Sequence, residues 1–266
     1  MKRIELDELK VVQLDILTVI DRFCRANGVK YSMGCGTMLG AARHKGYIPW
    51  DDDIDIYLLR EEYEKLIESF PEEVENVKLA ALQRDRLWDR AYAKAYDCRT
   101  EMQDGGRKYC VGVGIDVFPI DRVPADKEEW LQYDKKRRVY QLFYEWKNSM
   151  IFRKGRELWK YAFLPFTKLL LLPFSSRRIA VFLESYSMKY RELDTPYVFE
   201  CCQGIFQSRP FKRSALENII DMPFEDRVFC GMRDYDEYLS KSYGDWRKLP
   251  PKEKQKSHHI FNAWWK

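Results

Sequence analysis

The chain has 266 residues, of which 45% are hydrophobic, and this content excludes a largely disordered protein and allows a sizeable core. Its 46 basic and 42 acidic residues nearly cancel to a formal net charge of +4, which does not favour a nucleic-acid partner. The 7 cysteines are odd in number and lack any Cys-x-x-Cys pair, so neither a complete disulfide framework nor a zinc ribbon is indicated. The N-terminus is charged and has no apolar signal segment, and we therefore expect a cytoplasmic protein.

The first elements alternate between helix and strand. Apolar residues at three- and four-residue steps predict a helix over Leu6–Ala26 that covers the rear face of a sheet and ends at Asn27-Gly28. A short strand over 29–33 leads to a glycine-rich turn, and a second helix is predicted over 61–70.

An acidic run between these two helices is the most informative stretch. Four carboxylates lie within five residues at the entry to an apolar strand, and their mutual repulsion calls for a cation: Asp51, Asp52, Asp53 and Asp55. Strand alternation places Asp53 and Asp55 on one face, which predicts that they grip one divalent cation, Mg²⁺ or Mn²⁺. The alternative is a solvated acidic turn.

A glycine-rich turn precedes the acidic run. It offers exposed backbone N–H groups at Gly36, and Thr37 is predicted to cap a helix over 38–44. Together these features predict an anion site beside the metal site.

Two later strands carry single charged residues. The segments 77–82 and 90–97 look extended, and in the second Lys94 alternates with alanines, so it either faces a phosphate or is a solvated strand lysine. The buried strand predicted over 111–119 has Asp116 at its centre, where a nearby cation would offset the desolvation of its charge. The alternative is that backbone N–H groups or an arginine form hydrogen bonds with the Asp116 carboxylate.

The middle of the chain, 125–191, is predicted to be helical. Its apolar stretch 158–174 is too short and too interrupted to span a bilayer, since Pro165, Lys168 and Pro173 break it. Flanking cations would suit contact with an anionic membrane surface through 154–178, and packing on the catalytic core is the competing interpretation. Beyond it, strands are predicted over 197–206 and 222–230, followed by a helix over 236–243 that Gly244 caps.

Three motifs together resemble the LicD/fukutin family. They are Gly36-Thr37-x-Leu39-Gly40-Ala41-x-Arg43-His44-x-Gly46-x-Ile48-Pro49-Trp50-Asp51-Asp52-Asp53-Ile54-Asp55, then Ile115-Asp116-x-Phe118-Pro119-x-Asp121, then Tyr235-Asp236-x-Tyr238-Leu239 with Tyr243-Gly244-Asp245-Trp246. The resemblance covers about 5–124 and 195–260, and the first motif is long and therefore specific. It implies an α+β, nucleotidyltransferase-like mixed sheet flanked by helices, with an additional helical region in the middle of the chain.

The resemblance also implies a division of labour within the site. Asp53, Asp55 and Asp116 would be the catalytic and metal-binding acids, with Asp116 either completing the metal shell or taking the acceptor's proton. The donor would contact Gly36, Thr37, Arg43, Lys94 and His258. Arg43 alternatively forms a structural salt bridge to Asp51 or Asp52.

The resemblance implies transfer of a phospho-alcohol similar to phosphocholine from a CDP-alcohol donor. The acceptor would be a hydroxyl of a cell-surface glycan, such as lipopolysaccharide or capsule, or of the lipid-linked precursor of that glycan. Transfer of NMP from an NTP, and a non-catalytic binding protein on the same fold, are the alternatives. We expect a catalytic core over 1–124, a helical insertion over 125–194, and a segment 195–266 that completes the catalytic domain. A peripheral position on the inner face of the plasma membrane is also compatible with this reading.

Overall fold

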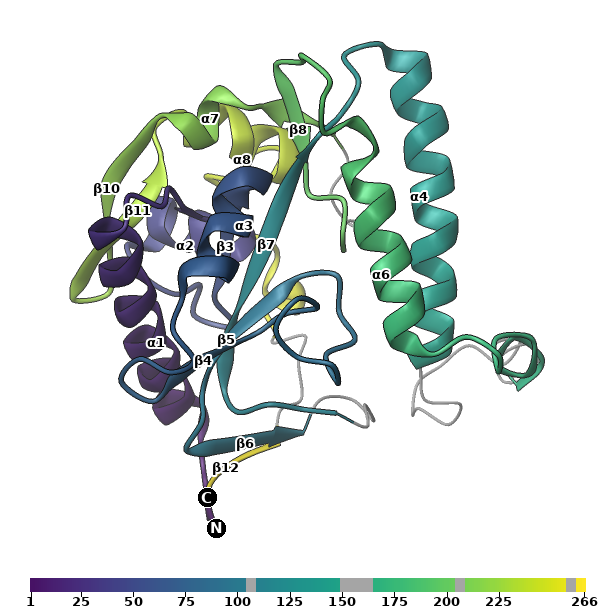
Figure 1. The fold of residues 1–266 in the computed structure, drawn as a ribbon. Helices are drawn as coiled ribbons and strands as arrows, with labels where there is room; N and C mark the ends of the chain where they lie inside the picture. Colours follow the sequence, from purple (N-terminus) through teal and green to yellow (C-terminus); the bar gives the residue numbers. More distant parts are fainter. Residues whose placement is uncertain (104–108, 149–164, 204–208, 257–261) are drawn as a thin grey trace.

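The structure, a computed structural model, describes residues 1–103, 109–148, 165–203, 209–256 and 262–266 (Figure 1). Its strands are β1 Lys2–Arg3, β2 Ser32–Met33, β3 Asp55–Leu59, β4 Val77–Ala80, β5 Ala93–Asp97, β6 Thr100–Gln103, β7 Gly114–Arg122, β8 Tyr197–Phe199, β9 Phe211–Lys212, β10 Ile219–Phe224, β11 Arg227–Met232 and β12 Asn262–Trp265. Its helices are α1 Leu6–Ala26, α2 Cys35–His44, α3 Arg60–Ser69, α4 Lys127–Asn148, α6 Ser176–Ser187, α7 Ser214–Glu217 and α8 Tyr235–Tyr243, with short 3₁₀ turns η1 Met188–Tyr190 and η2 Lys252–Lys254.

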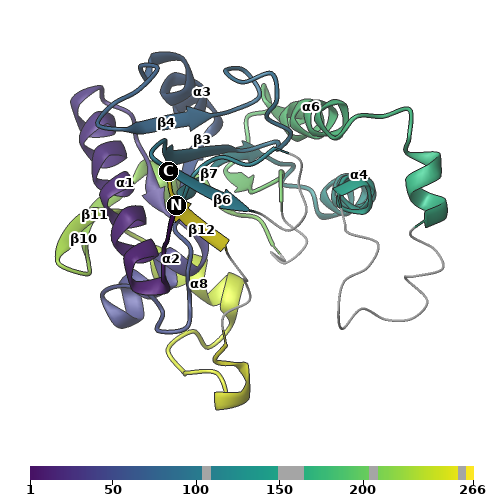
Figure 2. The same cartoon turned by 90° about the horizontal axis from the view of Figure 1, so that it is seen from below.

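The main sheet is mixed, with strand order β2-β3-β7-β5-β4. The pair β3–β7 is parallel, whereas β2, β5 and β8 pair antiparallel with their neighbours in it. Strands β1, β12 and β6 form a small separate sheet that brings the two chain ends together, as Figures 1 and 2 both show. This arrangement confirms the predicted α+β fold with a mixed sheet and flanking helices.

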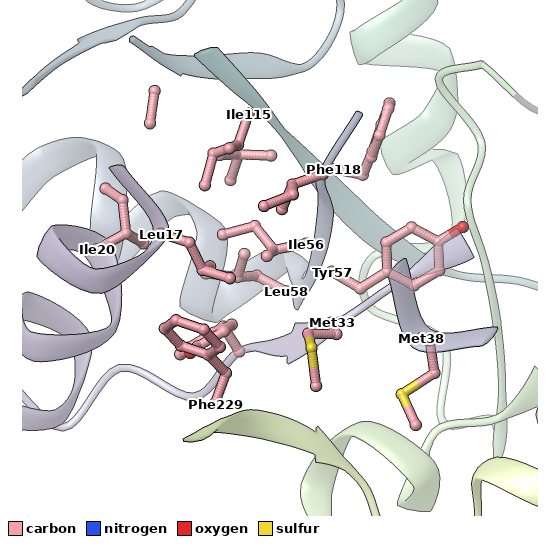
Figure 3. Close-up of a cluster of buried hydrophobic side chains, with 14 of the residues drawn as sticks. Leu17, Ile20, Met33, Met38, Ile56, Tyr57, Leu58, Ile115, Phe118 and Phe229 are labelled. Carbon is pink, nitrogen blue, oxygen red and sulfur yellow. The ribbon is translucent and has the colours of Figure 1, made fainter. Parts of the chain in front are cut away.

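Strand β3 is buried on both sides, which explains its uninterrupted apolar sequence after Asp55. Ile56 and Leu58 lie toward Leu17 and Ile20 of α1, whereas Tyr57 extends to the other side of the strand (Figure 3). Because the strand is anchored in this way, Asp55 at its first position is held at the edge of the core.

Helices α4 and α6 pack against each other beside the sheet (Figure 1). Buried arginines fix them to the core. Arg60 of α3 forms a two-point ion pair with Asp121 of β7 at 2.7 Å for each contact, and it also lies 3.5 Å from Glu184 of α6. In α4, the guanidinium of Arg137 donates to Asp134 and lies over the ring of Phe199 in β8. The described part of the middle region is therefore helical, as predicted, and its helices α4 and α6 are packed on the core.

Several boundaries differ from those predicted. The helix Leu6–Ala26 and the Gly244 cap, at φ +68°, are confirmed. The single strand predicted over 222–230 is wrong, because β10 and β11 form a hairpin that turns at Glu225, whose φ is +56°. The described helices include none long and apolar enough to cross a membrane.

Candidate active site

Three charged residues meet where β3, β7 and β5 run side by side. The strand register pairs Asp55 with Asp116 and Asp116 with Lys94, so the three residues form one row across the sheet. The ammonium of Lys94 bonds to the carboxylate of Asp116, with both side chains about four-fifths buried. Lys94 therefore forms an ion pair with Asp116 and is not the solvated strand lysine of the alternative.

An acidic cluster, Asp51–Asp53, lies directly before this row. One carboxylate oxygen from each of the three residues lies within 4.8 Å of the others, which is close enough for all three to share one cation. The sequence analysis chose Asp53 but not Asp51 or Asp52. Asp52 is buried, and its backbone carbonyl accepts a hydrogen bond from Gln13 of α1 at 3.0 Å.

The charges of these acids act on one another. Burial raises the pKa of Asp55 well above its usual range, and the negative charges of Asp53 and Asp116 raise it further. Asp51 acts in the same direction, whereas a hydrogen bond from Cys35 lowers this pKa. Such a set of carboxylate oxygens suits a hard divalent cation, and binding it would let Asp55 ionise.

The start of α2 lies against the acidic cluster. Gly34 is the N-cap residue, and a Cβ added at Gly36 would lie 2.7 Å from a carboxylate oxygen of Asp51. Thr37 does not cap the helix as predicted. It lies inside α2, which begins at Cys35, and its buried hydroxyl accepts the Asp55 backbone N–H at 2.8 Å. Thr37 thus fixes α2 to the first residue of β3.

Behind the acids lies a buried polar group that the sequence analysis did not identify. The Cys35 N–H donates to the hydroxyl of Tyr238 at 3.1 Å, and the Cys35 sulfur lies 2.8 Å from the hydroxyl of Tyr57. Cys35 has a φ of +42°, which is strained for a residue other than glycine. Burial raises the pKa of its thiol well above the usual range, so Cys35 positions its neighbours as a neutral group.

Arg43 does not form the salt bridge to Asp51 or Asp52 that was considered as its structural role. Its guanidinium donates to the carbonyl oxygens of Trp246 at 2.8 Å and Lys248 at 3.3 Å, and to the ring of His44 at 2.9 Å. Arg43 therefore joins α2 to the segment after α8. His258, the remaining predicted donor contact, lies outside the described residues.

Glu225 fixes the loop that leads into the acidic cluster. Its carboxylate accepts the Tyr47 N–H at 2.8 Å, and its own N–H donates to the Lys45 carbonyl at 2.7 Å. The sequence analysis did not identify Glu225.

The chain is similar to known proteins along its whole length. The family model for the LicD/FKTN/FKRP nucleotidyltransferase domain matches residues 28–181. A Haemophilus influenzae protein named lipopolysaccharide cholinephosphotransferase LicD is 33% identical over 267 residues, which cover 99% of each chain. The uncharacterized protein RT0683 of Rickettsia typhi is 38% identical over 63 residues, covering 23% of this chain and 20% of its own.

These matches confirm the predicted resemblance. The family match takes in the acidic cluster, Asp55, Lys94 and Asp116, and the full-length relative extends the similarity to the C-terminal helix and hairpin. The protein therefore belongs to the LicD/FKTN/FKRP nucleotidyltransferase-domain family.

Proposed function

We propose that the protein transfers phosphocholine from CDP-choline to a hydroxyl of a cell-surface glycan, with lipopolysaccharide or its lipid-linked precursor as acceptor. The proposal rests chiefly on one observation: an acidic cluster, Asp55 and Asp116 converge beside the start of α2 in a chain that is 33% identical, end to end, to a cholinephosphotransferase. The name of that relative supports phosphocholine as the transferred group and lipopolysaccharide as the acceptor, which the fold alone leaves open, and CDP-choline as donor is part of the proposal.

In this reaction the acceptor oxygen attacks the phosphorus that carries choline. The bond from that phosphorus to the bridging oxygen breaks, and CMP leaves with the bonding electrons. A divalent cation supplies charge neutralisation on the phosphate oxygens, and Asp53, Asp55 and Asp116 would hold it. The acidic cluster adds Asp51 and Asp52 as neighbouring ligands.

The chain's other groups bind and orient the donor. The first-turn N–H groups of an α-helix lack acceptors within the helix, and Gly36 and Thr37 occupy that turn of α2. We assign them to phosphate oxygens, together with Arg43. Asp116 takes the acceptor's proton if it is not itself a metal ligand, and the ammonium of Lys94, bonded to its carboxylate, holds that side chain in place.

The test is product analysis with purified protein, Mg²⁺ or Mn²⁺, CDP-choline and a glycan acceptor. Release of CMP with phosphocholine on the glycan is expected, and Asp55→Asn should abolish it. Asp194→Asn, at an exposed site, controls for the loss of one negative charge. Pyrophosphate release from an NTP, with no transfer from CDP-choline, would instead assign nucleotidyl transfer.

We further propose that the protein works at the cytoplasmic membrane surface and touches it through 154–178. In the described part, exposed apolar side chains gather at 165–174, with Phe166 57%, Leu170 61% and Leu172 66% exposed. Helical residues 165–170 stand apart from the sheet in Figures 1 and 2. Such a protruding apolar segment suits the boundary between lipid headgroups and acyl chains.

Sedimentation with anionic vesicles measures this contact. Leu170→Glu should reduce the bound fraction, whereas Val11→Glu, at an exposed position of helix α1, should leave it unchanged. Equal binding by both variants would remove the membrane contact from the proposal.

A further inference from the structure

A pocket of about 530 Å³ opens beside the acidic cluster. Three segments form it: helix α2, the loop 48–51 and the segment 243–254 that follows α8. We call it the Trp50 pocket, after one of its lining residues, and its charged and aromatic lining includes Arg43, Trp50, Asp51, Tyr243, Lys248 and Lys254. Its volume falls within the range of small-molecule sites, roughly 300–1,000 Å³.

The charge of this pocket favours an anion. All partners of Arg43 among the described residues are neutral, being two backbone carbonyls and the ring of His44. Burial lowers the pKa of Arg43, as expected for a cation that lacks a negative neighbour. Lys254 adds a second positive charge at the rim.

The same charges disfavour the choline group. A trimethylammonium is attracted by aromatic rings and carboxylates, and Asp245 is the second carboxylate of the pocket. Asp245, however, is already paired with Lys248 at 2.9 Å. The unneutralised guanidinium of Arg43 would repel a cationic headgroup.

Trp50 supplies a surface for a flat ring. It is partly exposed, and the ring of His44 supports it in an edge-on contact with centroids 6.4 Å apart. The buried Trp246, whose indole N–H donates to Asp236 at 2.9 Å, also lines the pocket. Aromatic side chains held in this way stack well on nucleobases.

We propose that the Trp50 pocket binds the nucleotide half of the donor, with the pyrimidine base against Trp50 and the nucleoside phosphate against Arg43 and Lys254. Asp51 belongs both to this pocket and to the acidic cluster, so the bond to be broken lies at the boundary between them. The choline group then lies outside this pocket. The inference rests on the proposed CDP-choline donor and adds where each half of it binds.

The experiment titrates the whole protein with CMP and, separately, with phosphocholine, both with Mg²⁺, by calorimetry. Trp50→Ala should weaken CMP binding about tenfold or more, because a lost base–aromatic stack costs roughly 1–3 kcal/mol. Trp50→Phe should retain most of the affinity. Phosphocholine binding should not change, and Trp146→Ala in α4 is the matched control.

The cationic side is tested in the same way. Arg43→Met and Lys254→Met should each weaken CMP binding several-fold, with Lys189→Met as control. Arg43 also joins α2 to the C-terminal segment, so CMP binding by Arg43→Met is interpreted only if this variant unfolds cooperatively in a thermal melt. If it does not, Lys254→Met and Trp50→Ala alone test the inference.

Two results would overturn the inference. Loss of phosphocholine affinity with unchanged CMP affinity would make the Trp50 pocket the headgroup site, and unchanged affinity for both ligands would remove the pocket from donor binding. Failure of the proposed function has a different signature: the wild-type protein would bind CMP in a Trp50-dependent manner yet transfer nothing from CDP-choline.

Discussion

Strand β7 carries an aspartate near each end, and the two are surrounded differently. Asp121 is almost inaccessible, and its two carboxylate oxygens accept from Nε and Nη2 of Arg60, each at 2.7 Å. Asp116 is about one-fifth exposed, is paired with the single ammonium of Lys94, and stands beside Asp55, whose pKa it raises. A buried carboxylate with a two-point guanidinium partner is typical of a structural element, whereas neighbouring carboxylates that raise one another's pKa are typical of a binding site.

The largest effect is expected from removing a carboxylate at the Asp116 end. Asp55→Asn should lower turnover by more than about 10²-fold, since it removes a ligand from the proposed cation site. The stability of the metal-free protein should hold or rise, because Asp55 is a buried acid beside other acids. Steady-state kinetics and melts without metal measure both quantities; full activity would show that Asp55 is not part of the site.

Asp116→Ala separates the two roles left open for that residue. If Asp116 is a metal ligand, calorimetry should show weakened Mg²⁺ binding together with lost turnover. If it acts as the base, Mg²⁺ binding should survive while turnover falls by about 10²–10⁴-fold. A strongly destabilised variant with normal metal affinity would make Asp116 resemble Asp121, and the contrast between the two ends would disappear.

At the other end of β7, Arg60→Met should act on folding and not on chemistry. It leaves Asp121 buried without its partner, which costs about 3–5 kcal/mol of unfolding free energy. Activity per folded molecule, measured below the denaturation midpoint, should be unchanged. The double variant Arg60→Met/Asp121→Leu should recover much of the stability, because it removes the stranded charge.

Glu200 extends the comparison to a buried carboxyl without a two-point partner. It directly follows β8, which pairs with β7 at Asp121, and burial raises its pKa from 4.5 to about 7 although the positive charge of Arg137 opposes this. The folded protein therefore keeps a proton between pH 4.5 and 7 that the unfolded chain releases. Stability should fall by up to about 3 kcal/mol as pH rises through this window, and level off above it.

The Glu200→Gln variant tests this assignment, because the amide cannot titrate. Urea denaturation at pH 5, 6, 7 and 8 should give a flatter stability profile for the variant than for the wild-type protein. Identical profiles would mean that Glu200 does not hold the proton.

The smallest effect is expected from Lys94→Met. Removing the ammonium leaves Asp116 partly buried without its cation, at a cost of about 1–3 kcal/mol in the metal-free protein. Added Mg²⁺ should then stabilise the variant more than the wild-type protein, since the cation replaces the lost charge. Equal metal-induced shifts in melting temperature would indicate that Lys94 and the cation do not share Asp116.

The sequence predicted those helices whose apolar spacing and capping residues lie within the element itself. Helix α1 and the Gly244 cap follow from apolar spacing and glycine, and the partial burial of Asp116 follows from the apolar residues around it. The hairpin turn at Glu225 was missed, because a glutamate at φ +56° gives no turn signal and its side chain is held by Tyr47, far away in sequence.

The candidate site shows the same division between local and long-range information. Spacing alone placed Asp53 and Asp55 together, and the family motif added Asp116. Tyr238, which accepts from Cys35, and Trp246, which accepts from Arg43, lie in the segment after β11, and no sequence pattern near Cys35 or Arg43 predicts these contacts. Side-chain roles that depend on such distant contacts need the folded structure.

The parallel pairing of β3 with β7 also bears on how fast the protein folds. Arg60 and Asp121, which lock this pair, are 61 residues apart, and β8 joins β7 only after the long helical region. Chains dominated by contacts this remote close large loops before they gain stabilising contacts, so they fold slowly. Refolding from denaturant should therefore be limited by docking of β7, and until then the apolar edge of β3 lacks its partner and is open to aggregation.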